Sequence, residues 1–443
     1  MFLKRKNHTL ISNKVFLERL EKFSSNYPRV INLSLNRIKR LLSHLDNPHL
    51  KLPPTIHIAG TNGKGSTIAF LYESLKSAGK TVHVYTSPHI LQVTERFIIA
   101  NKEVSYKKLF ETLDYCAKVN KGDPITQFEM LTCIAFLLMS NSKADIALIE
   151  TGLGGRLDAT NVIKNPILTI ITSISFDHVD FLGNSLQLIA TEKAGIMKKG
   201  SICISAPQSE IIEKVLLKES IERKSKLIVC NKNSIVRYCS DGFEVKRTKN
   251  IIYSFPNPAL KGHHQIINAA LAATSLLLCP KLDISINHIK YGISSATWQG
   301  RLELINNGNI KNITPSNCEV WLDGGHNIAG AEAIKNWIIV DKKRTRLKHF
   351  ILICGFLKNK DVKNILTILK YNIDHVIFVP LIDTKNAYCY KDLSNIAKSI
   401  NLKFYYKNSI KKALESKYIL KDSKILIFGS IYLVGEAIKL NKD

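Results

Sequence analysis

The stretch that most constrains the fold is Thr-Ile-His-Ile-Ala-Gly-Thr-Asn-Gly-Lys-Gly-Ser-Thr, residues 55–67. A short apolar run rich in β-formers ends at Gly60, a loop with three glycines follows, and a helical apolar pattern then begins. Strand, glycine loop and helix together can bind phosphate, because glycines let the backbone approach the anion and the N–H groups at the helix start point toward it. Lys64 adds a full positive charge, and Ser66 or Thr67 adds a hydroxyl.

The spacing differs from the usual P-loop, because the first glycine of G-x-x-x-x-G-K-[ST] would fall on Ile58 and because Gly65 separates the lysine from the serine. The alternative interpretation is a glycine-rich turn that only joins a strand to a helix. Strand, glycines, lysine and hydroxyls all agree with nucleotide binding. We therefore predict a nucleotide site with contacts from Gly60, Thr61, Asn62, Gly63, Lys64, Gly65 and Ser66.

Length and composition indicate a globular protein of two domains. The chain has 443 residues, too many for one core, and no apolar run approaches a membrane span; the best candidate, Leu131–Met139, lies in a helical pattern. The basic N-terminus lacks an apolar segment of signal-peptide length. Nine cysteines are scattered without a C-x-x-C pair, which fits reduced thiols in a cytoplasm better than a disulfide or zinc framework. We expect a cytoplasmic protein.

The formal net charge of +27 could indicate a nucleic-acid partner. Lys and Arg are, however, spread over the whole length and do not cluster along one element, so we expect no nucleic acid and no membrane as partner. A positive field would favour small anionic ligands such as ATP and glutamate-rich substrates.

The order of elements predicts an α/β fold. The first 50 residues read as helices, and further helices are expected within 105–140, 185–197 and 262–279. Strands are expected at 55–59, 81–85, 145–150 and 167–174, only short strands between about 200 and 260, and a second set of strands at 319–322, 350–354, 375–379 and 424–428. The pattern predicts a P-loop-type ATPase domain with a parallel sheet, residues 1–299, and a smaller Rossmann-like α/β domain, residues 300–443.

Polar residues follow four of the predicted strands. Pro88 ends one strand and leaves Ser87 at its carboxyl end, Glu150 leaves another into a glycine turn, and His178 follows a third. Because parallel strands end at one edge of a sheet, we expect these side chains to lie near Lys64. A carboxylate so placed resembles the metal-holding acid of nucleotide hydrolases. A lone histidine is more often structural, but its place after a buried strand favours a ligand role.

Seven strings occur in the order seen in the Mur ligase superfamily: Gly-Thr-Asn-Gly-Lys-Gly-Ser-Thr (60–67), Thr-Ser-Pro-His (86–89), Gly-Leu-Gly-Gly-Arg-Leu-Asp-Ala-Thr-Asn (152–161), Asp-His (177–178), Glu-Lys-Ala-Gly-Ile (192–196), Gly-Arg-Leu-Glu (300–303) and Asp-Gly-Gly-His-Asn (323–327). From about residue 30 to its end the chain closely resembles the folate branch of that superfamily, the dihydrofolate synthase and folylpolyglutamate synthase enzymes.

The resemblance implies ATP-dependent amide formation between a pteroate or folate carboxylate and the amine of L-glutamate, through an acyl phosphate. The implied substrates are 7,8-dihydropteroate and tetrahydrofolate, with ATP and Mg²⁺ bound by the N-terminal domain, the glutamate-ligase role in the C-terminal domain, and a monomer as the working form. Two Mg²⁺ ions are implied, with Ser87, Glu150 and His178 as ligands, together with Lys193 as a carbamate formed from CO₂. An isolated helical lysine would otherwise be a solvated surface charge.

The resemblance also implies further contacts. The ATP contacts are Asn268, Arg301 and Asp323, and the catalytic residues are Lys64, Lys193, His326 and Asp323. The pteroate pocket is lined by Thr86, Thr126, Gln127, Phe128, Glu129, Leu157, Asp158 and Ala159, although Phe128 could equally be a core residue. Two departures from the family pattern are Gly325 in place of alanine, which we expect to be minor, and Asn32 with Ser34 in place of an aspartate and a glycine, which weakens the pteroate assignment.

Three other functions are compared with this one. The enzyme could be a folylpolyglutamate synthase alone, or another Mur-type ligase that makes a cell-wall peptide bond, against which the string at 152–158 argues. It could also be a P-loop switch or a nucleic-acid-binding ATPase. We find no N-K-x-D guanine signature and no concentrated basic element, so this function is the least favoured.

Overall fold

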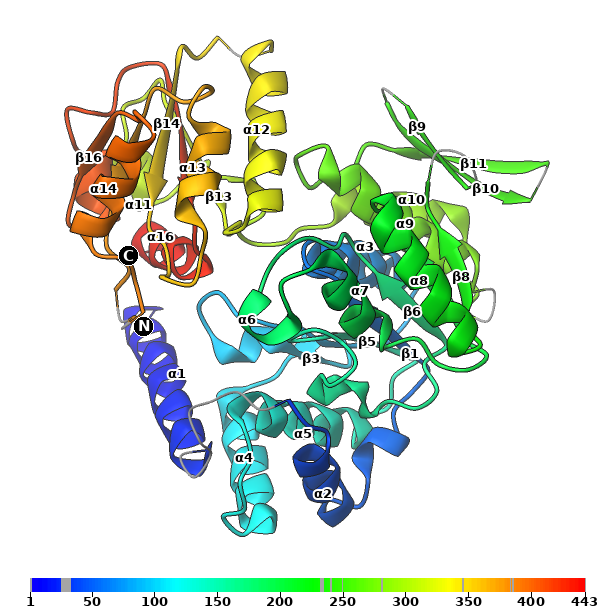
Figure 1. The fold of residues 1–443 in the computed structure, drawn as a ribbon. Helices are drawn as coiled ribbons and strands as arrows, with labels where there is room; N and C mark the ends of the chain where they lie inside the picture. Colours follow the sequence, from blue (N-terminus) through cyan, green and yellow to red (C-terminus); the bar gives the residue numbers. More distant parts are fainter. Residues whose placement is uncertain are drawn as a thin grey trace. The chain divides into compact units, whose positions relative to one another are not determined.

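The structure is a computed structural model that describes residues 2–24, 33–231, 235–239, 241–248, 250–279, 282–344, 346–382, 384 and 386–442. The chain divides into two compact units. Unit 1 comprises Met1–Ala259 and Ile266–Ala296, and unit 2 comprises Leu260–Gln265 and Thr297–Asp443. Each unit contains its own largely parallel sheet with helices on it, so the predicted α/β class is confirmed (Figure 1).

Unit 1 is organised around an eight-stranded sheet with the order β4-β3-β2-β5-β1-β6-β7-β8. Its strands are β1 (Thr55–Ala59), β2 (Val82–Tyr85), β3 (Phe97–Ile99), β4 (Lys102–Glu103), β5 (Ile146–Glu150), β6 (Leu168–Ile171), β7 (Ile202–Ser205) and β8 (Lys226–Val229). The pairs from β2 to β8 are parallel, whereas β3 and β4 extend one edge antiparallel. The sequence pattern did not predict β3 and β4, since two or three residues are too few to show a period.

The helices connect these strands. They are α1 (Phe2–Ser24), α2 (Asn36–His44), α3 (Lys64–Ser77), α4 (Tyr106–Asn120), α5 (Gln127–Ser140), α6 (Val179–Leu182), α7 (Leu186–Ala194), α8 (Glu210–Glu222), α9 (His264–Leu277) and α10 (Ile286–Ser295), with 3-10 turns η1 (Pro48–Leu50), η2 (Val93–Arg96) and η3 (Ala159–Val162). The prediction of strands alone between 200 and 260 was wrong for α8. Its buried residues include Ile212 and Leu216, which recur at helical spacing against the sheet.

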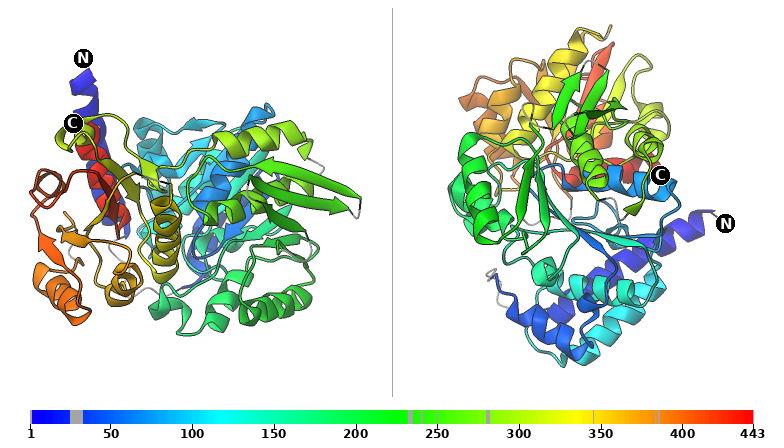
Figure 2. Two further views of the ribbon diagram at one scale, coloured as in Figure 1. Left: turned by 90° about the horizontal axis from the view of Figure 1, so that it is seen from above. Right: turned by 90° about the vertical axis from the view of Figure 1, so that its right-hand side faces the viewer.

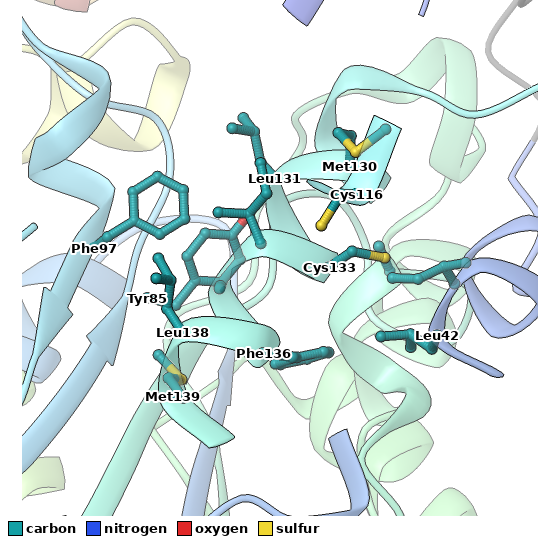
Figure 3. Close-up of a cluster of buried hydrophobic side chains, with 14 of the residues drawn as sticks. Leu42, Tyr85, Phe97, Cys116, Met130, Leu131, Cys133, Phe136, Leu138 and Met139 are labelled. Atoms are coloured by element: carbon teal, nitrogen blue, oxygen red, sulfur yellow. The ribbon is translucent and has the colours of Figure 1, made fainter. Parts of the chain in front are cut away.

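A large hydrophobic core of unit 1 lies between β2, β3 and β5 and the helices α2, α4 and α5, with the end of α1 added (Figure 3). Tyr85 and Phe97 project from the strands into this core, to which α5 contributes Leu131, Phe136 and Leu138. The most apolar run of the sequence, Leu131–Met139, is therefore part of a protein core. Within the described part of the chain, no helix is long and apolar enough to cross a membrane.

A second, antiparallel sheet stands out from the main sheet of unit 1 (Figure 2). It has the order β11-β10-β9, with β9 (Val236–Cys239), β10 (Gly242–Thr248) and β11 (Ile251–Pro256). Phe243 and Phe255 stack across it with ring centroids 5.2 Å apart.

Unit 2 has a six-stranded sheet with the order β12-β13-β17-β14-β15-β16. The strands are β12 (Glu303–Leu304), β13 (Glu319–Asp323), β14 (His349–Cys354), β15 (His375–Phe378), β16 (Phe404–Tyr406) and β17 (Ser423–Phe428); the helices are α11 (Asn309–Ile313), α12 (Ile328–Lys342), α13 (Val362–Leu369), α14 (Tyr390–Ser399), α15 (Ile410–Leu414) and α16 (Ile431–Lys442). All pairs are parallel except β12 with β13. All four strands predicted here are present.

Candidate active site

Four predicted site residues follow strands that are direct neighbours in the sheet. The order β2-β5-β1-β6 is parallel throughout, so the carboxyl ends of these strands lie side by side at one edge of unit 1. Glu150 ends β5 and is paired in register with Ile58 of β1. The glycine loop that leads into α3 begins at Gly60, two residues after Ile58. This edge is where open α/β sheets bind ligands.

The glycine loop is closely surrounded by neighbouring groups. A Cβ on Gly60 would lie 1.7 Å from Oγ1 of Thr172, and a Cβ on Gly63 would lie 2.3 Å from Oδ1 of Asn268. Gly63 has φ +91° and precedes the first turn of α3, so it supplies a left-handed conformation that other residues adopt at a cost. The buried Asn268 side chain, a predicted ATP contact, therefore lies against this loop.

Lys64 and Glu150 form a nearly desolvated ion pair. Their side chains are 15 % and 6 % exposed, and Nζ lies 3.7 Å from Oε1 of the carboxylate. The same Nζ donates to the carbonyl of Gly60 at 3.1 Å. The other carboxylate oxygen, Oε2, accepts the backbone N–H of Ser87 at 3.1 Å. Three of the four residues predicted at this edge are therefore joined by direct contacts.

Lys193 is buried and is not a solvated surface charge. It is 4 % exposed, and its Nζ donates to the carbonyl of Gly60 at 2.9 Å. Burial, together with the charge of the neighbouring Lys64, lowers its pKa to about 7, although Asp177 and Asp158 partly oppose the shift. A large fraction of this amine is therefore neutral near neutral pH.

The glycine turn after β5 fixes the position of Lys193. Gly155 lies so close to α7 that a Cβ there would be 2.5 Å from the carbonyl of Glu192. Arg156 donates its backbone N–H to the same carbonyl at 2.6 Å, and its guanidinium pairs with the Glu192 carboxylate. The string at 152–161 and the string at 192–196 are therefore in direct contact.

His178 lies at the start of α6 with φ +51°, and its side chain is 41 % exposed. Its Nε2 is 4.0 Å from Oδ1 of Asp177, which also accepts the backbone N–H of His178. Among the residues that the structure describes, no three His, Cys, Asp or Glu side chains come close enough together to hold a metal ion. The predicted metal set thus depends on Ser87, Glu150 and a modified Lys193 as much as on His178.

The predicted pteroate residues around α5 make internal contacts. Thr126 and Glu129 cap the helix reciprocally, with backbone-to-side-chain distances of 3.1 and 2.8 Å. The Glu129 carboxylate is 2.9 Å from Arg37 of α2. Gln127 is exposed. Asn32 lies outside the described residues, whereas Ser34 accepts the backbone N–H of Asn36 at 3.1 Å.

Phe128 and Asp158 lie against the glycine turn from two sides. A Cβ on Gly152 would lie 2.4 Å from the Phe128 ring, which also stacks on Tyr85 at 6.1 Å. Asp158 is buried, and its carboxylate accepts the N–H groups of Gly152 and Leu153 at 2.9 and 2.8 Å. Burial raises the pKa of Asp158, and these bonds oppose that shift. Of the other predicted pocket residues, Thr86 and Ala159 are buried and Leu157 is half-buried.

A second cluster of predicted residues lies in unit 2 at the carboxyl end of β13. Asp323 is 7 % exposed and accepts the N–H of Leu302 at 3.0 Å and that of Gly325 at 2.7 Å. A Cβ on Gly325 would lie 2.8 Å from Oδ1 of Asp323 and 2.9 Å from the ring of Phe428, so alanine does not fit here without a shift. That this departure is minor for function stays a prediction.

Arg301 and His326 flank the same turn of unit 2. Nη1 of Arg301 lies 3.5 Å from the position that a Cβ on Gly324 would take, and Nδ1 of His326 lies 3.1 Å from the Gly324 carbonyl. The sequence prediction did not name His264, a half-buried histidine whose pKa is lowered by burial and by Arg301, while Asp323 opposes the shift. The only available signal was its place before a helix in Gly-His-His-Gln.

Comparison with known proteins gives a consistent result. Residues 58–276 match the model of the Mur ligase middle domain, and residues 306–440 match that of the dihydrofolate synthetase C-terminal domain. The chain is 34 % identical to the dihydrofolate synthase/folylpolyglutamate synthase of Bacillus subtilis, covering 91 % of this chain and 93 % of that protein. It is 28 % identical to the dihydrofolate synthetase of Saccharomyces cerevisiae, covering 93 % and 99 %.

Solved structures resemble the whole chain. E. coli FolC in complex with DHPP and ADP has a TM-score of 0.85 at 25 % identity, covering 96 % of this chain and 97 % of that one. The Mycobacterium tuberculosis folylpolyglutamate synthase complexed with ADP and AMPPCP has a TM-score of 0.81 at 26 % identity, covering 97 % and 99 %.

Proposed function

Because the chain belongs to the dihydrofolate synthase/folylpolyglutamate synthase family of Mur ligases, we propose that it is an ATP-dependent ligase that adds L-glutamate both to 7,8-dihydropteroate and to tetrahydrofolate. The observation that carries this proposal is that Lys64 and Lys193 both donate to the Gly60 carbonyl, while Glu150 pairs with Lys64. These residues lie at the sheet edge where a phosphate-binding loop meets a buried carboxylate.

The reaction needs cations that bring two anions together. A carboxylate reacts with an amine only after its oxygen becomes a good leaving group, and transfer of the γ-phosphoryl group of ATP to the substrate carboxylate provides one. The glutamate amine then attacks the acyl carbon and phosphate leaves. Lys64 is placed to neutralise charge on the transferring phosphoryl group, since it is held at the loop and is shielded from water.

The residues present fit a magnesium site. Glu150 is a buried carboxylate that lies 3.7 Å from the Lys64 amine, and it accepts the backbone N–H of Ser87, whose side chain carries a hydroxyl. Mg²⁺ prefers one or two carboxylates together with phosphate and water oxygens. When bound, it would supply positive charge to the phosphates. We propose Glu150 and Ser87 as protein ligands, with His178 as a third.

Lys193 is proposed to carry a carbamate that completes a second magnesium site. A neutral amine adds to CO₂ and releases a proton, which gives an anionic carbamate. The buried amine with a pKa of about 7 is suited to that reaction, because its neutral form is abundant where an ordinary lysine is almost fully charged. The carbamate would also reverse the sign of charge next to Lys64.

The remaining roles are assigned by domain. We propose that residues 1–299 bind ATP, metal and the pteroate group, and that residues 300–443 supply the glutamate-ligase part, with Arg301, Asp323 and His326 acting there. Asn268 would contact ATP, as its place against Gly63 supports. We further propose a cytoplasmic monomer, in keeping with nine free cysteines.

The experiment is a product assay with ATP, Mg²⁺ and L-glutamate, with each acceptor tested in turn. Glutamate-dependent ADP release with dihydropteroate and with tetrahydrofolate, each giving the glutamylated product, is expected. Activity on tetrahydrofolate alone would reduce the enzyme to a folylpolyglutamate synthase; the match of residues 306–440 to a dihydrofolate synthetase domain favours the dihydropteroate activity. Turnover only with a UDP-sugar peptide precursor, or nucleic-acid retention without glutamate-stimulated turnover, would contradict the proposal.

A further inference from the structure

The loop of residues 86–96, called here the Ser87 loop, joins β2 to β3 and carries Ser87 to the edge of the sheet. Its two ends are tied together, because the Thr86 N–H donates to the Arg96 carbonyl at 3.1 Å. Near one end, the Ser87 N–H meets the Glu150 carboxylate at 3.1 Å. Any movement of this loop therefore moves a group that contacts the proposed metal ligand.

The Glu95 carboxylate holds the loop from the inside. It accepts three successive backbone N–H groups, those of Ile90, Leu91 and Gln92, at 2.7, 3.0 and 2.8 Å. The Arg96 guanidinium donates to Nδ1 of His89 at 2.9 Å. The loop is thus a rigid unit that can be positioned as a whole.

Asn13 of α1 holds the same loop from the outside. Its Oδ1 accepts the N–H of Val93 at 2.9 Å, and its Nδ2 donates to the carbonyl of Leu91 at 3.2 Å. Its Oδ1 also accepts the hydroxyl of Tyr106, the first residue of α4, at 2.9 Å. One amide side chain therefore connects the N-terminal helix, the Ser87 loop and α4.

The helix that carries Asn13 is attached independently of the loop. Phe16 and Leu20 are fully or almost fully buried in the core, and the Phe16 ring meets the Phe110 ring of α4 edge-on at 5.4 Å. Arg19 pairs with Asp114 of α4 at 2.8 Å. The helix needs none of the bonds from Asn13 to be held against α4, so these polar contacts have a separate consequence, which is to fix the loop.

We propose that Asn13 is a positioning residue for Ser87, acting through the Ser87 loop to keep the Ser87 end of the site against Glu150. Asn13 lies outside both stretches that match family models. The inference rests on the proposed role of Ser87 in binding metal. A half-buried set of hydrogen bonds of this kind matters where a displacement of about 1 Å in a site costs a large factor in rate.

The test compares N13A with two controls. N13A is expected to weaken Mn²⁺ binding to the complex with an unreactive ATP analogue by about tenfold, measured by electron paramagnetic resonance, and to raise the half-saturating Mg²⁺ concentration to the same extent, while the KM for glutamate stays unchanged. R19A removes the exposed helix-anchoring pair, and Y106F removes only the α4 partner of Asn13 and leaves both loop bonds intact. Both controls are expected to keep the wild-type Mg²⁺ dependence. A rise of equal size in R19A or Y106F, or no rise in N13A, would overturn the proposal.

Two further variants keep the result interpretable. S87A should raise the half-saturating Mg²⁺ concentration; if it does not, the metal role of Ser87 fails, whereas a rise in S87A without one in N13A removes the positioning role alone. If N13A does not fold, E95Q tests the loop from within, because it weakens the three backbone bonds without touching α1. An unchanged Mg²⁺ dependence in folded E95Q would contradict a role for the loop geometry.

Discussion

Two buried lysines of this molecule lie in opposite electrostatic surroundings. Lys193 in unit 1 and Lys424 in unit 2 are 4 % and 2 % exposed. Lys424 is held by the carboxylates of Glu319, at 3.0 Å, and Asp341, and its Nζ lies 5.2 and 5.4 Å from the ring centroids of Trp321 and Trp337. The ammonium group of Lys424 is therefore surrounded by two carboxylates and two aromatic rings, all of which stabilise its charge.

Lys193 is placed in the opposite way. Its hydrogen-bond acceptor is a neutral carbonyl, that of Gly60, and its strongest charged neighbour is another cation, Lys64. Burying a charge without a matched partner is costly, so the amine readily gives up its proton. The difference teaches that burial alone does not define a lysine's role. A matched lysine stabilises the fold, and an unmatched one is prepared for chemistry.

The largest effect is expected for K193A. Turnover should fall by at least about 10²-fold, because the proposed carbamate and its metal are lost, while the melting temperature stays the same or rises since a poorly matched buried amine is removed. Steady-state kinetics and thermal denaturation measure both. Wild-type turnover in K193A would contradict the proposed catalytic role of Lys193 and with it the functional difference between the two lysines.

The next effect is expected for E150Q, which keeps an oxygen for the Ser87 N–H but removes the charge next to Lys64. The half-saturating Mg²⁺ concentration should rise by about tenfold or more, because a charged ligand to a hard cation is lost. Titration of activity with Mg²⁺ at saturating ATP is the measurement. An unchanged Mg²⁺ requirement would show that the carboxylate at this edge serves only Lys64.

K424M should instead act on stability. Removing the cation leaves Asp341 without its buried partner and should cost about 2 kcal/mol of unfolding free energy, less than a fully buried pair would, since Glu319 is 39 % exposed. Urea denaturation measures this loss. The folded variant should keep its kcat and its KM values, and a selective loss of turnover would contradict a purely structural Lys424.

The pH dependence of stability should separate wild type from K193M. The folded-state pKa of Lys193 is about 7 and the ordinary value is 10.5, so between these values the unfolded chain binds more protons than the folded one. The stabilising contribution of Lys193 is thus complete above about 10.5 and is lost as the pH falls through about 7. In CO₂-depleted buffer, the unfolding free energy of the wild type relative to that of K193M should rise as the pH increases from about 7 to about 10.5. A flat difference would mean that Lys193 titrates normally.

The smallest effect is expected for E319Q. Its carboxylate is the more exposed partner of Lys424, so removing its charge should cost about 0.5 kcal/mol or less, whereas D341N should cost more. Chemical denaturation of both variants gives the ranking. An equal or larger loss of unfolding free energy in E319Q would show that the more exposed carboxylate is not the weaker partner of Lys424.

Much of the fold followed from local pattern. Strand β5 begins with a continuous apolar run, and β1 carries Ile56 and Ile58 in alternation. The glycine loop after β1 and the carboxylate at the end of β5 could be placed at one sheet edge by the rule for parallel sheets. Helix α8 could not be separated from short strands, because its isoleucines, valine and leucines come in short runs between lysines and glutamates.

The site was less accessible to pattern alone. Nothing in the spacing of residues 185–197 says that Lys193 is buried; only its family string suggested it, since burial there arises from the distant turn at Gly155. Asp158 and Glu129 were predicted as pocket residues, yet their carboxylates accept hydrogen bonds from nearby backbone groups that position the turn and the helix. A sequence motif does not show whether a side chain contacts the ligand or instead positions a neighbouring backbone segment.

The most direct test of the central claim is a crystal structure with Mn²⁺, an unreactive ATP analogue and bicarbonate, read by anomalous scattering. We predict a manganese peak at roughly 2.2 Å from the Glu150 carboxylate and extra carboxylate density on Nζ of Lys193. A manganese peak away from this sheet edge, with Lys193 unmodified and still bonded to the Gly60 carbonyl, would contradict the account.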